Sequence, residues 1–92
     1  TGEGFWAQLG DVLQRSAVDR LGRDAQGLTR GALAQRLGAA EIPSADIETW
    51  KGLLDRADAA RYGAGGEDQA ARRAALEKAR TLIEDPKWRP RA

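Results

Sequence analysis

The sequence contains no cysteine and no histidine among its 92 residues. Without cysteine the chain can form no disulfide and offers no thiolate, and without histidine it lacks the commonest general base and metal ligand. It also lacks an Asp-x-Asp-x-Asp-Gly loop, which would surround a calcium ion with oxygen ligands. We therefore expect a noncatalytic protein with no metal, no cofactor and no small-molecule substrate.

Methionine is absent too, even at position 1, so we expect a portion of a longer protein in which residues 1–4 are a leader or an engineered remnant. No run approaches the roughly 20 apolar residues that cross a bilayer, and no secretory signal is visible. This portion is therefore expected to be soluble. The formal charge is +1 with 32% charged residues, which indicates a solvated surface of mixed sign and not the basic surface of a nucleic-acid binder.

Aromatic residues are few, with one Phe, one Tyr and three Trp. A chain of this length forms one domain with one modest core. That core must consist mostly of Leu, Ile, Val and Ala, while each Trp can bury on the order of 200 Å². The tryptophans should therefore contribute disproportionately to stability.

A helical period is clearest in the stretch IETWKGLLDRADAARY, residues 47–62. Its large apolar residues fall in one sector of a helical wheel, and most of its charged residues fall outside that sector. Ser44 is the expected N-cap of this helix, Asp46 and Glu48 suit the positive end of its dipole, and Gly63 ends it. We expect the other helices to pack onto this one.

Three further helices are expected, at residues 5–21, 29–38 and 68–84. Thr29 is the expected N-cap of the short second helix, and Pro86 ends the fourth. The sequence thus predicts an all-α fold, a small bundle of four helices with a short second one. Residues 5–85 would form a single helical domain, and residues 86–92 a basic tail that is expected to be extended. The predicted core residues are Trp6, Leu9, Leu13, Leu33, Leu37, Ile47, Trp50, Leu53, Leu54, Leu76 and Ile83.

Four residues near the ends of helices are candidates for contact with a partner: Arg61, Tyr62, Trp88 and Arg89. Arg61 falls inside the apolar sector at the end of its helix, where a structural role as a cap is the favoured alternative. Trp88 either folds back onto the bundle or serves as an exposed anchor, since Trp and Arg are common at binding hot spots.

The acidic residues nearest to a general acid/base pair are Asp55 with Asp58, and Glu84 with Asp85. Such chemistry needs carboxylates that face each other in a desolvated cleft. The helical pattern places these residues on solvent-exposed faces or at a helix end, which favours a solvated charged surface.

Residues 28–50 offer an alternative function. LTRGALAQRLG resembles the first helix of a helix-turn-helix, and Ile47 with Trp50 resembles the apolar pair of a recognition helix. The connection between the two is longer than usual, and Asp46 and Glu48 would repel phosphate. A DNA-binding regulator fragment therefore stands as the alternative, and the favoured interpretation includes no nucleic acid.

The order of the segments resembles that of a known family. An aromatic-led helix, FWAQLGDVLQRSAVDRLG, is followed by LT with a short helix, by a helix ending LLDRADAARYG, and by an Ala-rich helix ending TLIED. Through Leu28-Thr29, Leu53-Leu54 and Arg61-Tyr62-Gly63, the chain from Phe5 to about Asp85 resembles the cytoplasmic C-terminal region of BatD-like oxygen-tolerance (aerotolerance) proteins.

This resemblance implies a bacterial, membrane-anchored parent with an extracytoplasmic β-rich portion and a transmembrane helix. Members of the family are encoded beside MoxR-type AAA+ ATPases and von Willebrand factor A-domain proteins, with proposed roles in oxygen tolerance, envelope stress or assembly. The expected function is a noncatalytic protein-interaction domain on the cytoplasmic face of the inner membrane. Its partner would be a von Willebrand A-domain protein or a MoxR-type ATPase, and the family supplies no catalytic residue.

Overall fold

A computed structural model describes residues 2–61 and 69–88. It is built from helices, and no strand occurs in these two ranges. The prediction of an all-α bundle with a short second helix is therefore confirmed. The elements are α1 (Gly2–Leu21), the 3-10 turn η1 (Arg23–Ala25), α2 (Arg30–Ala39), α3 (Ser44–Arg61), α4 (Gln69–Glu84) and the 3-10 turn η2 (Pro86–Trp88).

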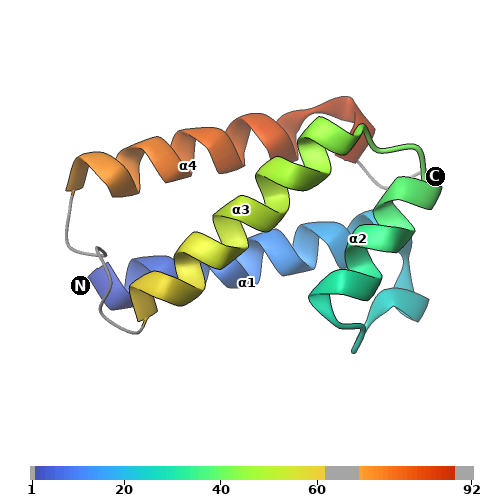
Figure 1. The fold of residues 1–92 in the computed structure, drawn as a ribbon, viewed down its shortest axis with the longest axis horizontal. Coiled ribbons are helices and arrows are strands. Elements are labelled where there is room, and N and C mark those ends of the chain that lie inside the picture. The colour runs from blue at the N-terminus through green and yellow to red at the C-terminus, as the bar shows by residue number, and fades with distance from the viewer. Residues whose placement is uncertain (1, 62–68, 89–92) are drawn as a thin grey trace.

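The three long helices lie side by side, with α1 and α4 running in one direction and α3 running back between them (Figure 1). The short helix α2 packs across one end of α1 and α3. The other three helices all contact α3, as predicted, and its most extensive contact is with α1. Helix α1 is nevertheless the central element, because it contacts every other helix and both 3-10 turns. Helix α1 begins at Gly2, so residues 2–4, expected as a leader, belong to it.

Most of the predicted core residues are buried. Ile47 and Ile83 are only partly buried and pack against the edge of the core. The prediction for Leu76 is wrong, because its side chain is 40% exposed. Helix α4 instead turns Ala75, Ala79 and Leu82 inward, and Leu76 lies about 100° around the helix from Ala75. The confirmed core residues are Trp6, Leu9, Leu13, Leu33, Leu37, Trp50, Leu53 and Leu54.

Trp50 joins the two helices with the largest mutual contact. Its side chain is fully buried, and its indole Nε1–H donates a hydrogen bond to the carbonyl oxygen of Leu13 at 2.9 Å. The bond leaves the polar atom of the indole satisfied inside the core, which is the condition for burying a Trp at low cost. One residue therefore supplies both apolar area and a directional link from α3 to α1.

The cap predictions for α2 and α3 differ in outcome. Thr29 is the N-cap of α2, since its Oγ1 accepts a hydrogen bond from the Ala32 amide at 3.2 Å. Ser44 is not an N-cap but the first residue of α3. The Pro43 carbonyl accepts from the Ile47 amide at 3.1 Å, so Pro43 occupies the cap position.

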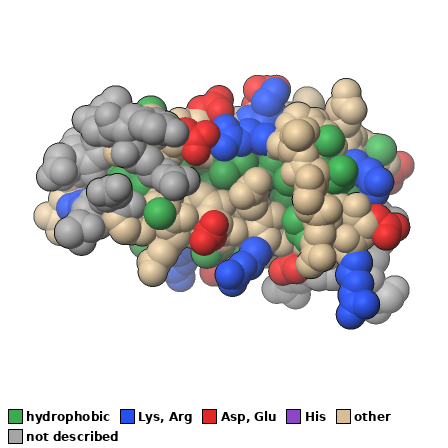
Figure 2. Space-filling model, turned by 90° about the horizontal axis from the view of Figure 1, so that it is seen from below, with side chains coloured by type: hydrophobic (Ala, Val, Ile, Leu, Met, Phe, Trp, Pro, Cys, Tyr) green, Lys and Arg blue, Asp and Glu red, His purple; other side chains and the backbone are tan. Residues whose placement is uncertain are grey.

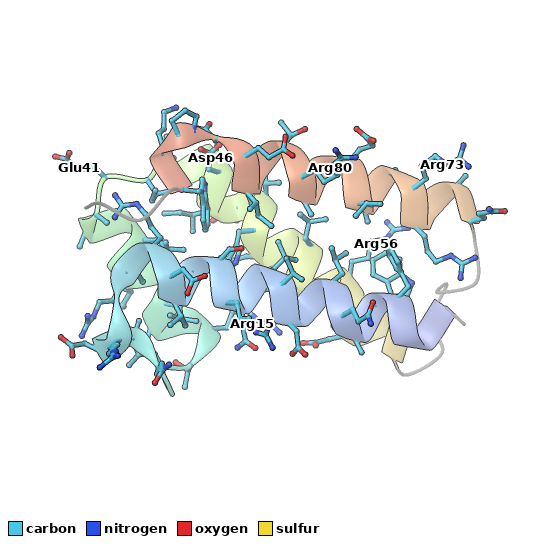
Figure 3. All side chains as sticks on the ribbon, turned by 180° about the vertical axis from the view of Figure 1, so that it is seen from behind. Arg15, Glu41, Asp46, Arg56, Arg73 and Arg80 are labelled. Carbon is cyan, nitrogen blue, oxygen red and sulfur yellow. The ribbon has the colours of Figure 1, made fainter. Side chains whose placement is uncertain are left out.

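Helix α2 ends in a Schellman motif. The Ile42 amide donates to the Leu37 carbonyl at 3.1 Å, and the Glu41 amide donates to the Gly38 carbonyl at 3.0 Å. Glu41 therefore adopts a left-handed backbone with φ of 70°, at the position where glycine is preferred. Its side chain projects away from the bundle (Figure 3).

Replacing Glu41 with glycine is expected to raise the free energy of unfolding by about 1 kcal/mol, because glycine adopts positive φ without steric strain. Urea denaturation followed by circular dichroism would measure the change. Glu41→Ala is the control, since it removes the carboxylate but keeps Cβ. Equal stabilisation by both variants would show that the gain comes from lost charge and not from relieved strain.

The segment after α4 turns back onto the bundle. Trp88 is 3% exposed, so its interpretation as an exposed anchor is wrong and the alternative, that it folds back, is confirmed. The extended conformation predicted for the tail is also wrong for Pro86–Trp88, which forms a 3-10 turn. The turn is held by Asp85, whose carbonyl accepts from the Trp88 amide at 2.9 Å and whose carboxylate accepts from the Lys87 amide at 3.0 Å.

Arg20 of α1 holds this turn in place. Its Nε–H donates to the Lys87 carbonyl at 2.7 Å, and its Nη2 donates to the Ala40 carbonyl at 3.1 Å. One guanidinium thus connects α1 to η2 and to the end of α2. Charge-assisted hydrogen bonds of this kind are stronger than neutral ones.

Candidate functional site

A groove runs between α3 and α4. One part, of about 520 Å³, is lined by the middle of α3 and the first half of α4. A second part, of about 350 Å³, continues toward the start of α3 and the end of α4. Thr49 and Lys78 line both parts, so the groove is continuous. From Ala71 to Asp85 it follows α4 for about 20 Å, given a rise of about 1.5 Å per residue.

The groove exists because the facing side chains are small. Gly52 on α3 and Ala71, Ala74 and Ala75 on α4 line its first part. These residues contribute at most one methyl group each, so they cannot fill the space between two helices. Leu53 is the large apolar residue that lines this part, but its side chain is buried in the core, with 5% of its surface exposed. It therefore does not fill the groove.

Gly52 is the unusual residue of this surface. It lies in the interior of an 18-residue helix, where glycine is less favourable than alanine by about 1 kcal/mol. A Cβ added at this position would meet no atom within 4 Å. No contact with the described residues therefore requires a glycine here, although it lowers the stability of the helix.

The two parts of the groove differ in charge. Near the start of α3 acidic residues predominate, since Asp46, Glu77 and Asp85 line that part. Arg56 and Glu48 line the other part, and Lys78 lines both. Asp46 and Arg56 lie toward opposite ends of α4 (Figure 3). The Asp46 carboxylate has one buried oxygen, Oδ2, that accepts no hydrogen bond from any described residue.

Arg56 is positioned by an aromatic ring. Its guanidinium carbon lies 5.7 Å from the centroid of the Trp6 ring, a cation–π contact between α3 and α1. The contact leaves the side chain exposed at the rim of the groove while restricting its position. It can therefore present its donors to a carboxylate at a smaller entropic cost than a free arginine.

The four predicted interaction residues do not contribute to the groove as described. Arg61 is the last residue of α3, and its side chain, like Tyr62 and Arg89, lies outside the described residues. Trp88 is part of the core. The residues that line the groove were missed because they are small or were interpreted as solvated surface. Gly52 alone carried a readable signal, as a glycine inside a strong helical pattern.

The candidate acid/base pairs have other partners in the structure. Arg30 of α2 contacts Asp55 at 2.8 Å and Asp58 at 2.7 Å on α3, so these carboxylates tie two helices together. Glu84 lies 3.9 Å from Arg80. Among the residues placed by the structure, no three acidic side chains gather as metal ligands would, and no helix is long and apolar enough to cross a membrane.

The helix-turn-helix alternative depends on the exposed face of α3. Trp50, one of its two marker residues, is buried against α1, and Glu48 and Thr49 are exposed. The visible surface carries basic and acidic side chains intermixed (Figure 2). Nothing in this arrangement favours a phosphate backbone as the ligand.

Comparison of the chain with protein-family models, curated proteins and solved structures found no match.

Proposed function

We propose that this domain is a noncatalytic protein-interaction module that binds a helix of its partner in the groove between α3 and α4. The observation that carries the proposal is Gly52, an exposed glycine inside a helix with empty space where its side chain would be. A residue that lowers helix stability and satisfies no internal contact is explained if a ligand approaches the backbone there.

The dimensions and chemistry of the groove suit a helix. A length of about 20 Å matches roughly 14 helical residues. A large apolar side chain of the ligand would occupy the part of the groove beside Gly52 and Ala74. Recognition of this kind, with an amphipathic helix in a groove, depends on such anchors. The carboxylates of Asp46 and Glu77 favour basic residues or the N-terminal end of the ligand helix, and Arg56 favours its C-terminal end.

The resemblance to BatD-like proteins supplies the biological setting of the proposal. In this proposal the domain lies on the cytoplasmic side of a membrane-anchored oxygen-tolerance or envelope-stress protein. The partner would then be a von Willebrand A-domain protein or a MoxR-type ATPase. The supporting features are the segment order and the motifs of the helices, which the all-α bundle accommodates.

The test is photo-crosslinking from the groove in cells of the parent organism, using the full-length protein with a photoreactive amino acid at Thr49. We expect a discrete adduct, identifiable by mass spectrometry, that is lost when Gly52→Leu fills the groove. Gly31→Leu is the matched control, because an added Cβ there also meets nothing within 4 Å, whereas Gly31 lies in the first turn of α2 and does not line the groove. Both variants should fold, since each gains helix propensity.

Three outcomes are informative. An adduct with a protein of either expected class would support the whole proposal. An adduct with an unrelated protein, lost only in Gly52→Leu, would support the groove and contradict the family setting. Absence of any adduct, or equal loss in both glycine variants, would overturn the interaction module.

A further inference from the structure

A second surface lies on the opposite side of α4 from the groove. The large apolar residues that are exposed in the described part of the chain are Leu76, at 40%, and Val12, at 47%. Leu76 lines a shallow hollow of about 290 Å³ together with Phe5, which is partly buried at the start of α1. Val12 is not among the residues that line this hollow, so Leu76 is its exposed apolar side chain and the partly buried ring of Phe5 extends the apolar surface.

Two arginines complete this hollow. Arg72 and Arg73 line it beside Leu76, Phe5 and Gln69, and no carboxylate is among the lining residues that the structure describes. Neither guanidinium forms an ion pair with a described residue, whereas Arg80, one turn beyond Leu76, lies 3.9 Å from Glu84. Arg73 and Arg80 both lie on α4 (Figure 3). The hollow therefore combines an apolar floor with two cations that have no described anionic partner.

From this arrangement we infer that the hollow binds a short acidic protein segment with one large apolar side chain. The apolar side chain covers Leu76 and Phe5. Arg72 and Arg73 lie four and three residues before Leu76, so their guanidinium groups are about one helical turn from it. When the ligand is bound, its carboxylates therefore lie toward the N-terminal end of α4 from its apolar side chain. Arginine suits this role because its planar group donates two parallel hydrogen bonds to one carboxylate.

The observations favour a protein segment over other anionic macromolecules. Nucleic-acid sites neutralise many phosphates along an extended basic surface, and this chain has a formal charge of +1. Attraction to an anionic membrane grows with the number of basic residues near its surface, so two arginines provide little. A pair of arginines beside an apolar hollow instead matches the size of a short acidic motif.

This site is independent of the proposed groove. Its α4 residues Arg72 and Leu76 lie about 160° around the helix from Ala74 and Lys78, respectively, which line the groove. Filling the groove with Gly52→Leu should therefore leave binding at the hollow unchanged.

The experiment measures fluorescence anisotropy of a short fluorescein-labelled peptide with a central Phe between glutamates, added to the whole 92-residue chain. We expect binding that weakens at least about tenfold in Arg72→Gln/Arg73→Gln, since a lost charged hydrogen bond exceeds the free energy of a tenfold change. Leu76→Ser should also weaken binding. Arg36→Gln/Arg80→Gln is the matched control, because it removes the same charge from exposed positions outside the hollow.

Several results would overturn the inference. The first is that the peptide does not bind, and the second is that the two arginine double variants weaken binding equally. The third is that Leu76→Ser keeps the full affinity. The fourth is that a peptide with glutamines in place of the glutamates binds equally well. Loss of binding in Gly52→Leu would place the peptide in the groove and also contradict a second site. Tighter binding of phosphatidylserine vesicles or duplex DNA, with the same dependence on Arg72 and Arg73, would assign the hollow to that other class of ligand.

Discussion

Trp50→Ala is expected to lower the free energy of unfolding by about 4 kcal/mol, the largest effect of any single substitution proposed for this domain. The side chain is fully buried between α3 and α1, so its removal leaves a cavity in addition to the lost transfer free energy. A domain of this size has a total stability of only about 5–15 kcal/mol. Guanidinium denaturation followed by circular dichroism at 222 nm would measure the loss.

Phenylalanine substitutions separate the hydrogen bond of Trp50 from its packing. Trp50→Phe removes the donor to the Leu13 carbonyl, whereas Trp88 Nε1 is buried without an acceptor among the described residues. Trp50→Phe should therefore cost about 1 kcal/mol more than Trp88→Phe. Equal costs would show that the bond to Leu13 adds nothing to the net stability.

Arg20→Met is expected to cost about 2 kcal/mol, because it removes two charge-assisted hydrogen bonds to main-chain carbonyls but keeps most of the aliphatic stem. The loss should be concentrated where η2 docks. In an NMR spectrum, the indole N–H of Trp88 should exchange with solvent faster than in the parent protein, while that of Trp50 should change little.

Arg36→Met is the control for this substitution, since Arg36 is exposed on α2 and exposed positions usually tolerate change within about 0.5 kcal/mol. If both variants lost the same stability, a general effect of charge would explain the result. The hydrogen bonds from Arg20 to the Lys87 and Ala40 carbonyls would then make no specific contribution to stability.

The agreement between sequence and structure is best where large apolar residues recur with a helical period. Leu9 and Leu13 of α1 and Leu53 and Leu54 of α3 are buried as predicted. In each of these helices the large apolar residues define a single face, so the buried side can be identified from the sequence. Helix α4 is different, since alanines occupy several of its faces and do not distinguish the buried one. Leu76 was therefore assigned to the core, although Leu82 is the buried leucine of this helix.

Residues outside the helices were harder to assign because their burial depends on distant parts of the chain. Ile42 lies in the connection between α2 and α3 yet is 4% exposed, since the Schellman motif turns it inward. Trp88 follows a proline in a basic segment that looks like a tail. Its burial depends on contacts with α1, and no local pattern reveals such contacts.

The candidate groove could be only partly predicted. It depends on the relative placement of α3 and α4, and that placement follows from packing and not from either helix alone. The choice of Arg61 and Trp88 used residue types that are common in binding sites. Gly52 would have been a better guide to the binding site. Glycine destabilises a helix, so its presence at an exposed helical position indicates a requirement other than helix formation.

The contact between Arg20 and Lys87 also bears on how the domain folds. It joins residues 67 positions apart in the sequence, and closing so long a loop loses chain entropy before any contact at that end is gained. We therefore expect the packing of η2 to be a late step in folding. In the native protein, we expect release of this segment by local opening to uncover Trp88 while α1, α2 and α3 stay folded.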